Sequence, residues 1–281
     1  MSNPITLTSG MRKNLFSLQK TQSMLETTQT RLATGQRVQK AVDDPVNYFT
    51  ALEHTQRADD LSVRKDEMAE AIQLINSAND GVEAITSLIA SAKSLAQSAL
   101  SSSGTESLTT LASQYNEVLS QIDLLAADSG YKGVNLLAGT HVSQEVKFDE
   151  KGDSYLTMQG FNANSTGETL SLMSVNASDW IGTGDTADLT NINSAISRLD
   201  SATTSLRSEA QKLSTNLSTI TIRQDFTNNM INTLKDGAGN LTNADMNEEG
   251  ANMLMLQTRQ SLGTTSLSLA SQAAQSVLRL F

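Results

Sequence analysis

The sequence predicts a mainly α-helical protein: a long antiparallel helical coiled-coil bundle formed by both termini, with a small β-hairpin-rich insert at the middle of the chain. Three observations predict this fold. Apolar residues recur at alternating intervals of four and three over long stretches at both ends, as in coiled coils. The chain has two prolines, so long helices can run without a kink. Aromatic residues make up 4% of the chain, which suits helices packed side by side better than a thick globular core.

The first predicted helix begins near the N-terminus and carries a heptad seam. Its predicted seam residues are Met11, Leu15, Leu18, Gln22, Leu25, Gln29 and Leu32. The pattern stops at Thr34 and Gly35, where glycine can end a helix.

A second helix is expected to begin at Asp43–Pro45. Proline suits the first turn of a helix, and the aspartates before it suit capping and the helix dipole. Apolar periodicity continues to about Leu100 and breaks at Ser101–Gly104. A shorter helix then runs to about Asp128.

The middle of the chain, from His141 to about Asp188, changes character. Alternating apolar residues at Val146 and Phe148, a turn, and a second run at Tyr155–Met158 predict a β-hairpin. We expect a further strand at Glu168–Val175. Because the two chain ends should pair, we expect this insert at the far tip.

Within this insert, the short polar segment Asn162–Gly167 is expected to form an exposed loop.

Helix resumes at Leu189 and keeps strict four-three spacing to Leu234. Gly237 and Gly239 are expected to end it and to act as a hinge. Either Asn243 or Asp245 can cap the last helix. The seam expected in that helix consists of Leu267, Ala270, Ala274, Val277 and Phe281.

No combination of residues predicts catalysis, a cofactor or a metal site. His54 and His141 are far apart, and the chain has no cysteine. The paired carboxylates Asp43 and Asp44 are explained better by capping and turn formation. A net charge of -10 argues against nucleic acid. We expect no membrane span and no cleaved signal peptide.

Several motifs resemble those of bacterial flagellins, the subunits of the flagellar filament. The segment Arg31–Val38, RLATGQRV, followed by the Asp43–Asp44 pair, is similar to the family's N-terminal signature. Asn79–Gly81 resembles its NDG motif, and Gln275–Phe281, QSVLRLF, resembles its C-terminal ending. Asp44–Pro45 and the segment 257–264 look most like the alphaproteobacterial type.

The resemblance implies three domains and a structural role. Residues 1–40 with 243–281 would form an inner helical domain in the filament core. Residues 41–139 with 189–241 would form an outer helical bundle, and 140–188 an exposed β-rich insert. The implied partners are further copies of the chain, an export chaperone, the type III export apparatus, and the filament cap and hook-junction proteins. The implied location is the extracellular flagellum.

The assembly interface expected on this basis combines apolar residues of both terminal helices. It consists of Leu15, Leu18, Leu25, Leu32, Leu267, Ala270, Ala274, Val277 and Phe281.

Two alternatives remain open from the sequence. A hook–filament junction protein shares the terminal helices and the Asp43–Pro45 motif, although the ending Gln275–Phe281 favours a flagellin. A cytoplasmic coiled-coil scaffold would carry heptads through its middle, where this chain has its β-rich insert.

Overall fold

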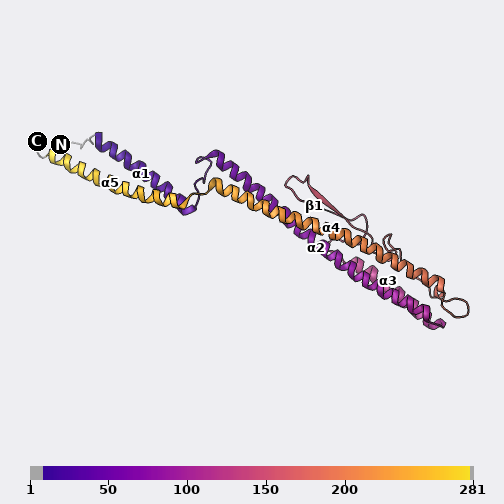
Figure 1. Ribbon diagram of the computed structural model, residues 1–281. Helices are drawn as coiled ribbons and strands as arrows, with labels where there is room; N and C mark the ends of the chain where they lie inside the picture. Colours follow the sequence, from indigo (N-terminus) through magenta and orange to yellow (C-terminus); the bar gives the residue numbers. More distant parts are fainter. Residues whose placement is uncertain (1–8, 279–281) are drawn as a thin grey trace. The chain divides into compact units, whose positions relative to one another are not determined.

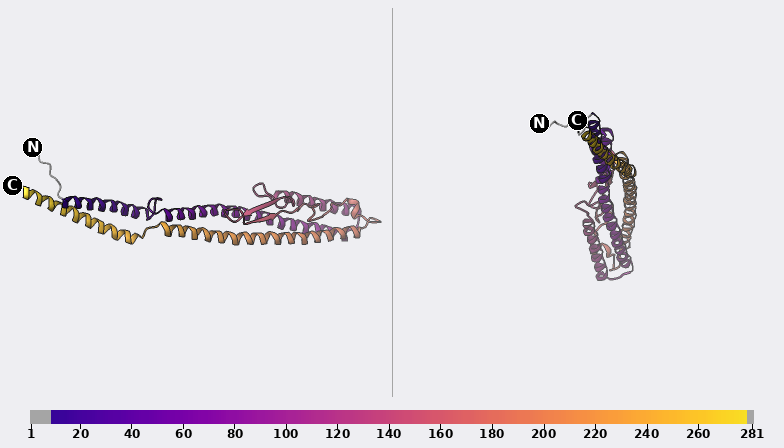
Figure 2. Two further views of the ribbon diagram at one scale, coloured as in Figure 1. Left: turned by 90° about the horizontal axis from the view of Figure 1, so that it is seen from above. Right: turned by 90° about the vertical axis from the view of Figure 1, so that its left-hand side faces the viewer.

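The computed structural model of the protein describes residues 9–278 (Figures 1 and 2). Its elements in chain order are α1 (Ser9–Thr34), α2 (Pro45–Ser101), α3 (Thr105–Asp128), β1 (Ser143–Lys147), β2 (Tyr155–Gln159), the 3-10 helix η1 (Ala177–Trp180), α4 (Leu189–Thr242) and α5 (Met246–Leu278). The predicted mainly α-helical fold with a small β-hairpin is therefore confirmed.

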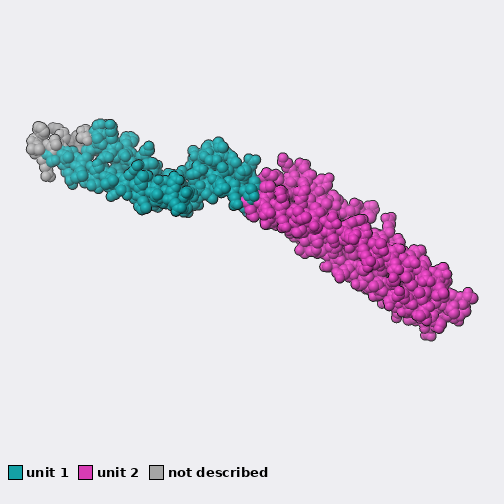
Figure 3. All heavy atoms as spheres, in the orientation of Figure 1, with its two compact units in different colours: residues 1–56, 233–281 teal, residues 57–232 magenta. Residues whose placement is uncertain are grey.

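The chain divides into two compact units (Figure 3). Unit 1 consists of Met1–Gln56 and Thr233–Phe281, so it contains α1, α5, the start of α2 and the end of α4. Unit 2 is the continuous segment Arg57–Asn232.

A single hydrophobic cluster forms the core of unit 2. It combines side chains from α2, α3 and α4 with side chains from the segment between α3 and α4. Trp180 of η1 is completely buried and packs on Tyr115 of α3, with ring centroids 5.2 Å apart. Met158 of β2 is also completely buried. The middle of the chain therefore supplies part of this core.

The β-hairpin has the predicted antiparallel pairing, with Val146 opposite Leu156. Its turn is attached to α2 and α4. The carboxylate of Glu150 forms an ion pair with Arg57 of α2 at 2.9 Å. Arg223 of α4 lies over the ring of Phe148, 5.2 Å from its centroid.

The expectation that the insert occupies the far tip is wrong for this hairpin. At the opposite end of unit 2, the α2–α3 turn pairs with the loop before α4: Gly104 donates to the carbonyl of Asp185 at 3.0 Å. The hairpin instead folds back along the bundle, where burial of Val146 and Met158 stabilises it.

Two further expectations for the insert are also wrong. Glu168–Val175 contains no strand, because Leu172 donates its backbone N–H to Ser165 rather than to a neighbouring strand. Asn162–Gly167 is not an exposed loop. Ala163 is fully buried, and Ser165 donates its backbone N–H and its hydroxyl to Asp123 of α3, at 2.6 and 3.0 Å.

Helix α4 does not end at Gly237 and Gly239, as the sequence led us to expect, but continues to Thr242. Ala238 between them is buried, and the Cα of Gly237 faces His54 of α2 with room for ordinary packing. Packing within unit 1 therefore outweighs the low helix propensity of glycine.

Candidate assembly interface

Helices α1 and α5 run side by side in opposite directions within unit 1 (Figures 1 and 2). Gln260 donates its side-chain amide to Gln22 at 2.8 Å, and Asn14 donates to Ser266 at 3.2 Å. The later residue of α1, Gln22, therefore bonds to the earlier residue of α5, Gln260, so the two helices are antiparallel. This is the pairing of the two chain ends that the sequence predicts.

The α1 side of this pair has a different phase from the predicted seam. Its less exposed residues recur at Met11, Asn14, Leu18, Thr21, Leu25, Thr28 and Leu32. Leu18, Leu25 and Leu32 lie on the predicted face, whereas Leu15, Gln22 and Gln29 are exposed. In place of these three residues, the residue one position earlier in each case faces α5: Asn14, Thr21 and Thr28. The buried hydroxyl of Thr21 donates to the carbonyl of Ser17.

The α5 side has the predicted phase. Its less exposed residues recur at Glu249, Met253, Leu256, Gln260, Gly263, Leu267, Ala270 and Ala274. Leu267, Ala270 and Ala274 are half-buried there. The side chain of Val277 and all of Phe281 lie outside the part of the chain that the structure describes.

Gly263 allows α1 and α5 to approach closely. A Cβ atom built at this position would lie 2.7 Å from Cδ2 and 3.0 Å from Cγ of Leu18. Even the smallest side chain would displace Leu18, so glycine at this position sets the spacing of the two helices.

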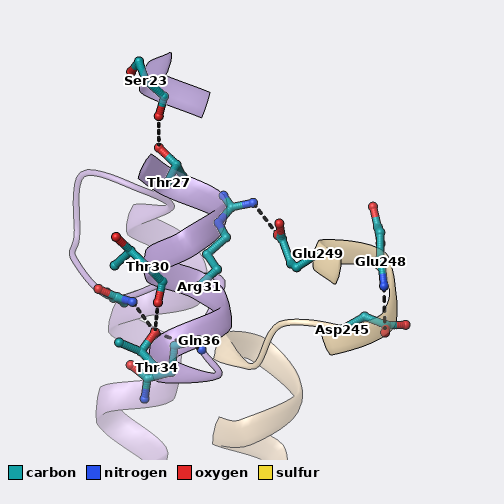
Figure 4. Close-up of polar contacts among 10 residues, drawn as sticks. Ser23, Thr27, Thr30, Arg31, Thr34, Gln36, Asp245, Glu248 and Glu249 are labelled. Carbon is teal, nitrogen blue, oxygen red and sulfur yellow. Dashed lines mark hydrogen bonds and ion pairs between the residues drawn. The ribbon is translucent and has the colours of Figure 1, made fainter. Parts of the chain in front are cut away.

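An ion pair joins the end of α1 to the start of α5 (Figure 4). Arg31 of α1 donates to Glu249 of α5 at 2.8 Å, and Glu249 is 6% exposed. The first turn of α5 is capped by Asp245, whose carboxylate accepts the backbone N–H of Asn247 at 2.8 Å and that of Glu248 at 3.3 Å. Of the two capping candidates, Asp245 is therefore the cap.

The segment after α1 is bonded to the segment before α5. Ala244 donates its N–H to the carbonyl of Gly35 at 2.9 Å, and Arg37 donates its own to Thr242 at 2.7 Å. Gly35 has φ +72, a conformation that favours glycine. The Arg31–Val38 motif therefore ends α1 and bonds its backbone to the end of α4 and to the segment that precedes α5.

Asp43 closes a turn before α2, and Asp44 caps the first turn of that helix. The Asp43 carboxylate accepts the backbone N–H groups of Lys40 at 3.0 Å and Gln39 at 3.1 Å, and these bonds hold the pKa of Asp43 below its usual value. Asp44 accepts the N–H of Asn47 at 3.2 Å in the first turn of α2. These three bonds match the interpretation of the aspartate pair as turn formation and capping.

Sequence reasoning missed the Arg31–Glu249 pair. Arg31 opens the N-terminal motif and Glu249 lies in the first turn of the last helix, but nothing in the sequence couples them. The two residues meet because the antiparallel packing of the helices brings the end of α1 to the start of α5.

No chemical centre accompanies this helix pair in the part of the chain that the structure describes. Residues 9–278 contain no group of three or more His, Asp or Glu side chains placed to hold a metal ion. None of the helices there has the length and apolar character needed to cross a membrane.

Comparison with known proteins gives matches along most of the chain. Residues 7–142 match the model of the bacterial flagellin N-terminal helical region, and residues 189–281 match that of the C-terminal helical region.

Individual relatives agree with the family models. Flagellin FljK of Caulobacter vibrioides is 29% identical over 99% of this chain and 98% of its own. A flagellin of Brucella melitensis is 26% identical over 95% of both chains. The crystal structure of Bacillus cereus flagellin aligns with a TM-score of 0.48 and 16% identity, covering 57% of this chain and 88% of its own.

These matches favour a filament subunit over the junction protein and the cytoplasmic scaffold. They cover both helical ends, and two of the relatives match almost from end to end. The chain therefore belongs to the bacterial flagellins, of the alphaproteobacterial type, and is a structural subunit of the flagellar filament.

Proposed function

We propose that α1 and α5 are the part of this subunit that polymerises, and that they become fully ordered only in the filament. The observation that supports this most strongly is the composition of the α1–α5 seam. Thr21, Thr28 and Gly263 occupy positions where a stable coiled coil would carry large apolar residues. The seam therefore buries little apolar surface for its length.

A simple comparison of magnitudes supports coupled ordering. Apolar burial contributes about 25 cal/mol per Å², whereas ordering a residue costs roughly 1–2 kcal/mol in backbone entropy. The seam positions that carry threonine, alanine or glycine offset little of this cost. Contacts with neighbouring subunits would supply the missing burial.

The domains would follow from this role of the terminal helices. Residues 1–40 with 243–281 would form the filament core, and 41–139 with 189–241 the outer bundle. Residues 140–188 would lie toward the filament surface. The pairing of α1 with α5 and the separate core of unit 2 support this assignment.

Membership of the flagellin family supports the remaining parts of the proposal. The subunit would be exported by the type III apparatus without a cleaved signal peptide, with help from an export chaperone. It would assemble beneath the filament cap, on the hook-junction proteins. It would have no catalytic role, no membrane contact and no nucleic-acid partner.

The assembly interface would include Leu18, Leu25 and Leu32 of α1 with Leu267, Ala270 and Ala274 of α5, and, beyond the described side chains, Val277 and Phe281. Leu15 would belong to it as a residue that contacts another subunit, because it faces away from α5.

The experiment compares two charge substitutions on α5. Ala274→Asp places a carboxylate on the half-buried seam, and an unpaired buried charge costs several kcal/mol in every subunit. Gln272→Asp adds the same charge at an exposed position two residues away. We expect Ala274→Asp to abolish filaments in electron micrographs while unit 2 melts normally, and Gln272→Asp to form filaments. Filaments of normal length from Ala274→Asp would refute the proposal.

A further inference from the structure

The outer edge of strand β1 has no strand beside it in the part of the chain that the structure describes, because the sheet there consists of β1 and β2 alone. Phe148 donates its N–H to the carbonyl of Ser154 at 2.8 Å, and Gly160 donates to Val142 at 2.7 Å. Hydrogen-bonded and non-hydrogen-bonded pairs alternate along an antiparallel ladder. The residues of β1 that direct their backbone N–H and C=O groups away from β2 are therefore Ser143, Glu145 and Lys147.

A groove runs along this free edge within unit 2. Its volume is about 420 Å³, which lies in the range of protein ligand pockets. Residues 144–147 of β1 line one side, residues of α2 between positions 64 and 74 line another, and the turn at 131–134 completes the lining. All the strand residues that line the groove belong to β1, so it follows the edge of the sheet. Its lining includes the buried apolar side chains of Ala71, Leu74 and Val146.

Charged side chains hold this groove together and balance each other. The carboxylate of Glu70 on α2 accepts the hydroxyl of Tyr131 at 3.0 Å and pairs with Lys132 at 2.7 Å, which fixes the turn against the helix. The lining contains three cationic and three anionic side chains: Arg64, Lys132, Lys147, Glu67, Glu70 and Glu145. A ligand without net charge suits such a lining.

Arg64 carries a donor that lacks an acceptor. Its Nη1 donates to both carboxylate oxygens of Glu67, each at 2.8 Å. Its Nε, within the described part of the chain, is buried and has no hydrogen-bond partner. An unsatisfied buried donor costs about 1–3 kcal/mol. A ligand that places a carbonyl oxygen at this side of the groove would satisfy it.

The edge of β1 also lacks the usual features that keep edge strands unpaired, such as a proline, a bulge or an inward-pointing charge. All five residues of β1 are described; none is proline, and the register with β2 is regular. Glu145 and Lys147 alternate with the buried Val146, so their side chains lie on the opposite face of the strand. The edge is therefore open to another strand.

We propose that this groove binds an extended peptide segment of another protein, which adds a third strand beside β1. Donors and acceptors that alternate along an edge match the main chain of a strand, as in other cases of strand addition. The five residues of β1 span about 17 Å at ~3.4 Å per residue, so about five residues of the partner fill the edge. The segment has no net charge, and its apolar side chains alternate with polar ones so that one face packs on Leu74 and Val146. The site lies within unit 2, so the proposal does not depend on polymerisation through α1 and α5.

Hydrogen exchange of individual amides in the full-length monomer, followed by NMR, tests this proposal. The probe is a heptapeptide of alternating threonine and valine, acetylated and amidated at its ends. At saturating probe, exchange at Glu145 or Lys147 should slow at least about tenfold. The amides of Gln144 and Val146, which face β2, should be protected with and without the probe.

The alternation separates strand addition from other kinds of binding. If the probe displaced β2, the amides of Glu145 and Lys147 would stay fast while those of Tyr155–Gln159 became faster, and this result would overturn the proposal. No change at Glu145 and Lys147 would overturn it as well. The same heptapeptide with proline at its central position is the control, because proline has no N–H to donate, and it should give less slowing.

A pair of substitutions at one position gives a second test. Glu145→Pro removes an N–H that points away from β2, a position at which an edge strand tolerates proline. Glu145→Ala removes the same side chain and keeps the N–H. Glu145→Pro should weaken binding of the probe about tenfold, because a hydrogen bond is lost and its acceptor left unpaired, whereas Glu145→Ala should bind as the unmodified chain does.

The amide of Val146 shows whether the hairpin survives the proline. Equal binding by the two variants, with Val146 protected in both, would overturn the proposal. If Glu145→Pro loosens the hairpin, the exchange pattern of the unmodified chain decides the question by itself.

Discussion

The substitution Gly81→Ala tests the packing of unit 2. Gly81 lies inside α2, in the Asn79–Gly81 motif, and faces the turn that follows α3. A Cβ atom at this position would lie 2.3 Å from Oγ and 2.8 Å from Cβ of Ser129, and 3.1 Å from Cδ2 of Leu137. Real Cβ atoms do not approach neighbours at the first two distances, so something must move.

The surrounding atoms have little freedom to move. Ser129 is buried, its hydroxyl donates to the carbonyl of Leu125 at 2.7 Å, and its own carbonyl accepts from Ser77 at 3.3 Å. Leu137 is completely buried. Overpacking a core costs about 1–3 kcal/mol, and replacing glycine by alanine inside a helix returns about 1 kcal/mol at most. We expect a net loss of about 1–2 kcal/mol.

The assay is thermal unfolding of the full-length monomer, followed by circular dichroism. For a unit of this size we expect the Tm of unit 2 to fall by roughly 2–8 °C. Gly237→Ala, in unit 1, controls for the substitution of a helical glycine without a clash, because a Cβ atom there would lie 3.6 Å from Cδ2 of His54, an ordinary contact. That variant should be neutral or stabilising by about 0.5–1 kcal/mol. A Gly81→Ala protein as stable as the unmodified chain would refute the packing argument.

Three further predictions follow from particular contacts. A short epitope tag inserted after Ser165 should lower the Tm of unit 2, because that residue binds Asp123, whereas the same tag after the exposed Thr183 should leave it unchanged. The turn closed by Asp43 should open only below pH 3.8, the usual pKa of Asp, because folding lowers the pKa of this carboxyl. The stability that the Asp43 carboxylate contributes is lost as the pH falls through its lowered pKa, and the amide chemical shifts of the turn report the loss. Arg31→Gln should leave the Glu249 carboxylate buried without its cation and weaken the α1–α5 pair by about 1–3 kcal/mol, measured as faster hydrogen exchange in filaments; unchanged exchange would contradict the role of the pair.

The helices and the hairpin could be predicted because periodicity and breakers report on local packing. Helix α1 ends just before Gly35 and α2 begins at Pro45, as expected. Gly35 has a positive φ that favours glycine, and proline suits the first turn of a helix. The continuation of α4 through Gly237 could not be predicted, because it depends on packing against α2.

The α1 seam shows why the candidate interface was only partly predictable. Two heptad phases share Leu18, Leu25 and Leu32, and hydrophobicity favours the one that contains Leu15. The structure uses the other phase, in which Thr21 and Thr28 are buried. Seam positions with small polar residues add nothing to the apolar periodicity from which a helix face is predicted.

The folding of the middle segment was the least predictable feature. Trp180 is remote in sequence from Tyr115, and burial of both rings together depends on long-range packing. The hydrogen bonds of Ser165 to Asp123 likewise form between segments whose sequences carry no signal of the contact.

Hydrogen exchange on monomer and filament tests the central claim, that the terminal helices become ordered on assembly. In the monomer, amides of Leu15–Leu32 in α1 should exchange far faster than those of Leu206–Ile220, whose leucine and isoleucine side chains pack in or against the core of unit 2. In the filament, both segments should be protected. A monomer in which Leu15–Leu32 is as protected as Leu206–Ile220 would contradict the claim.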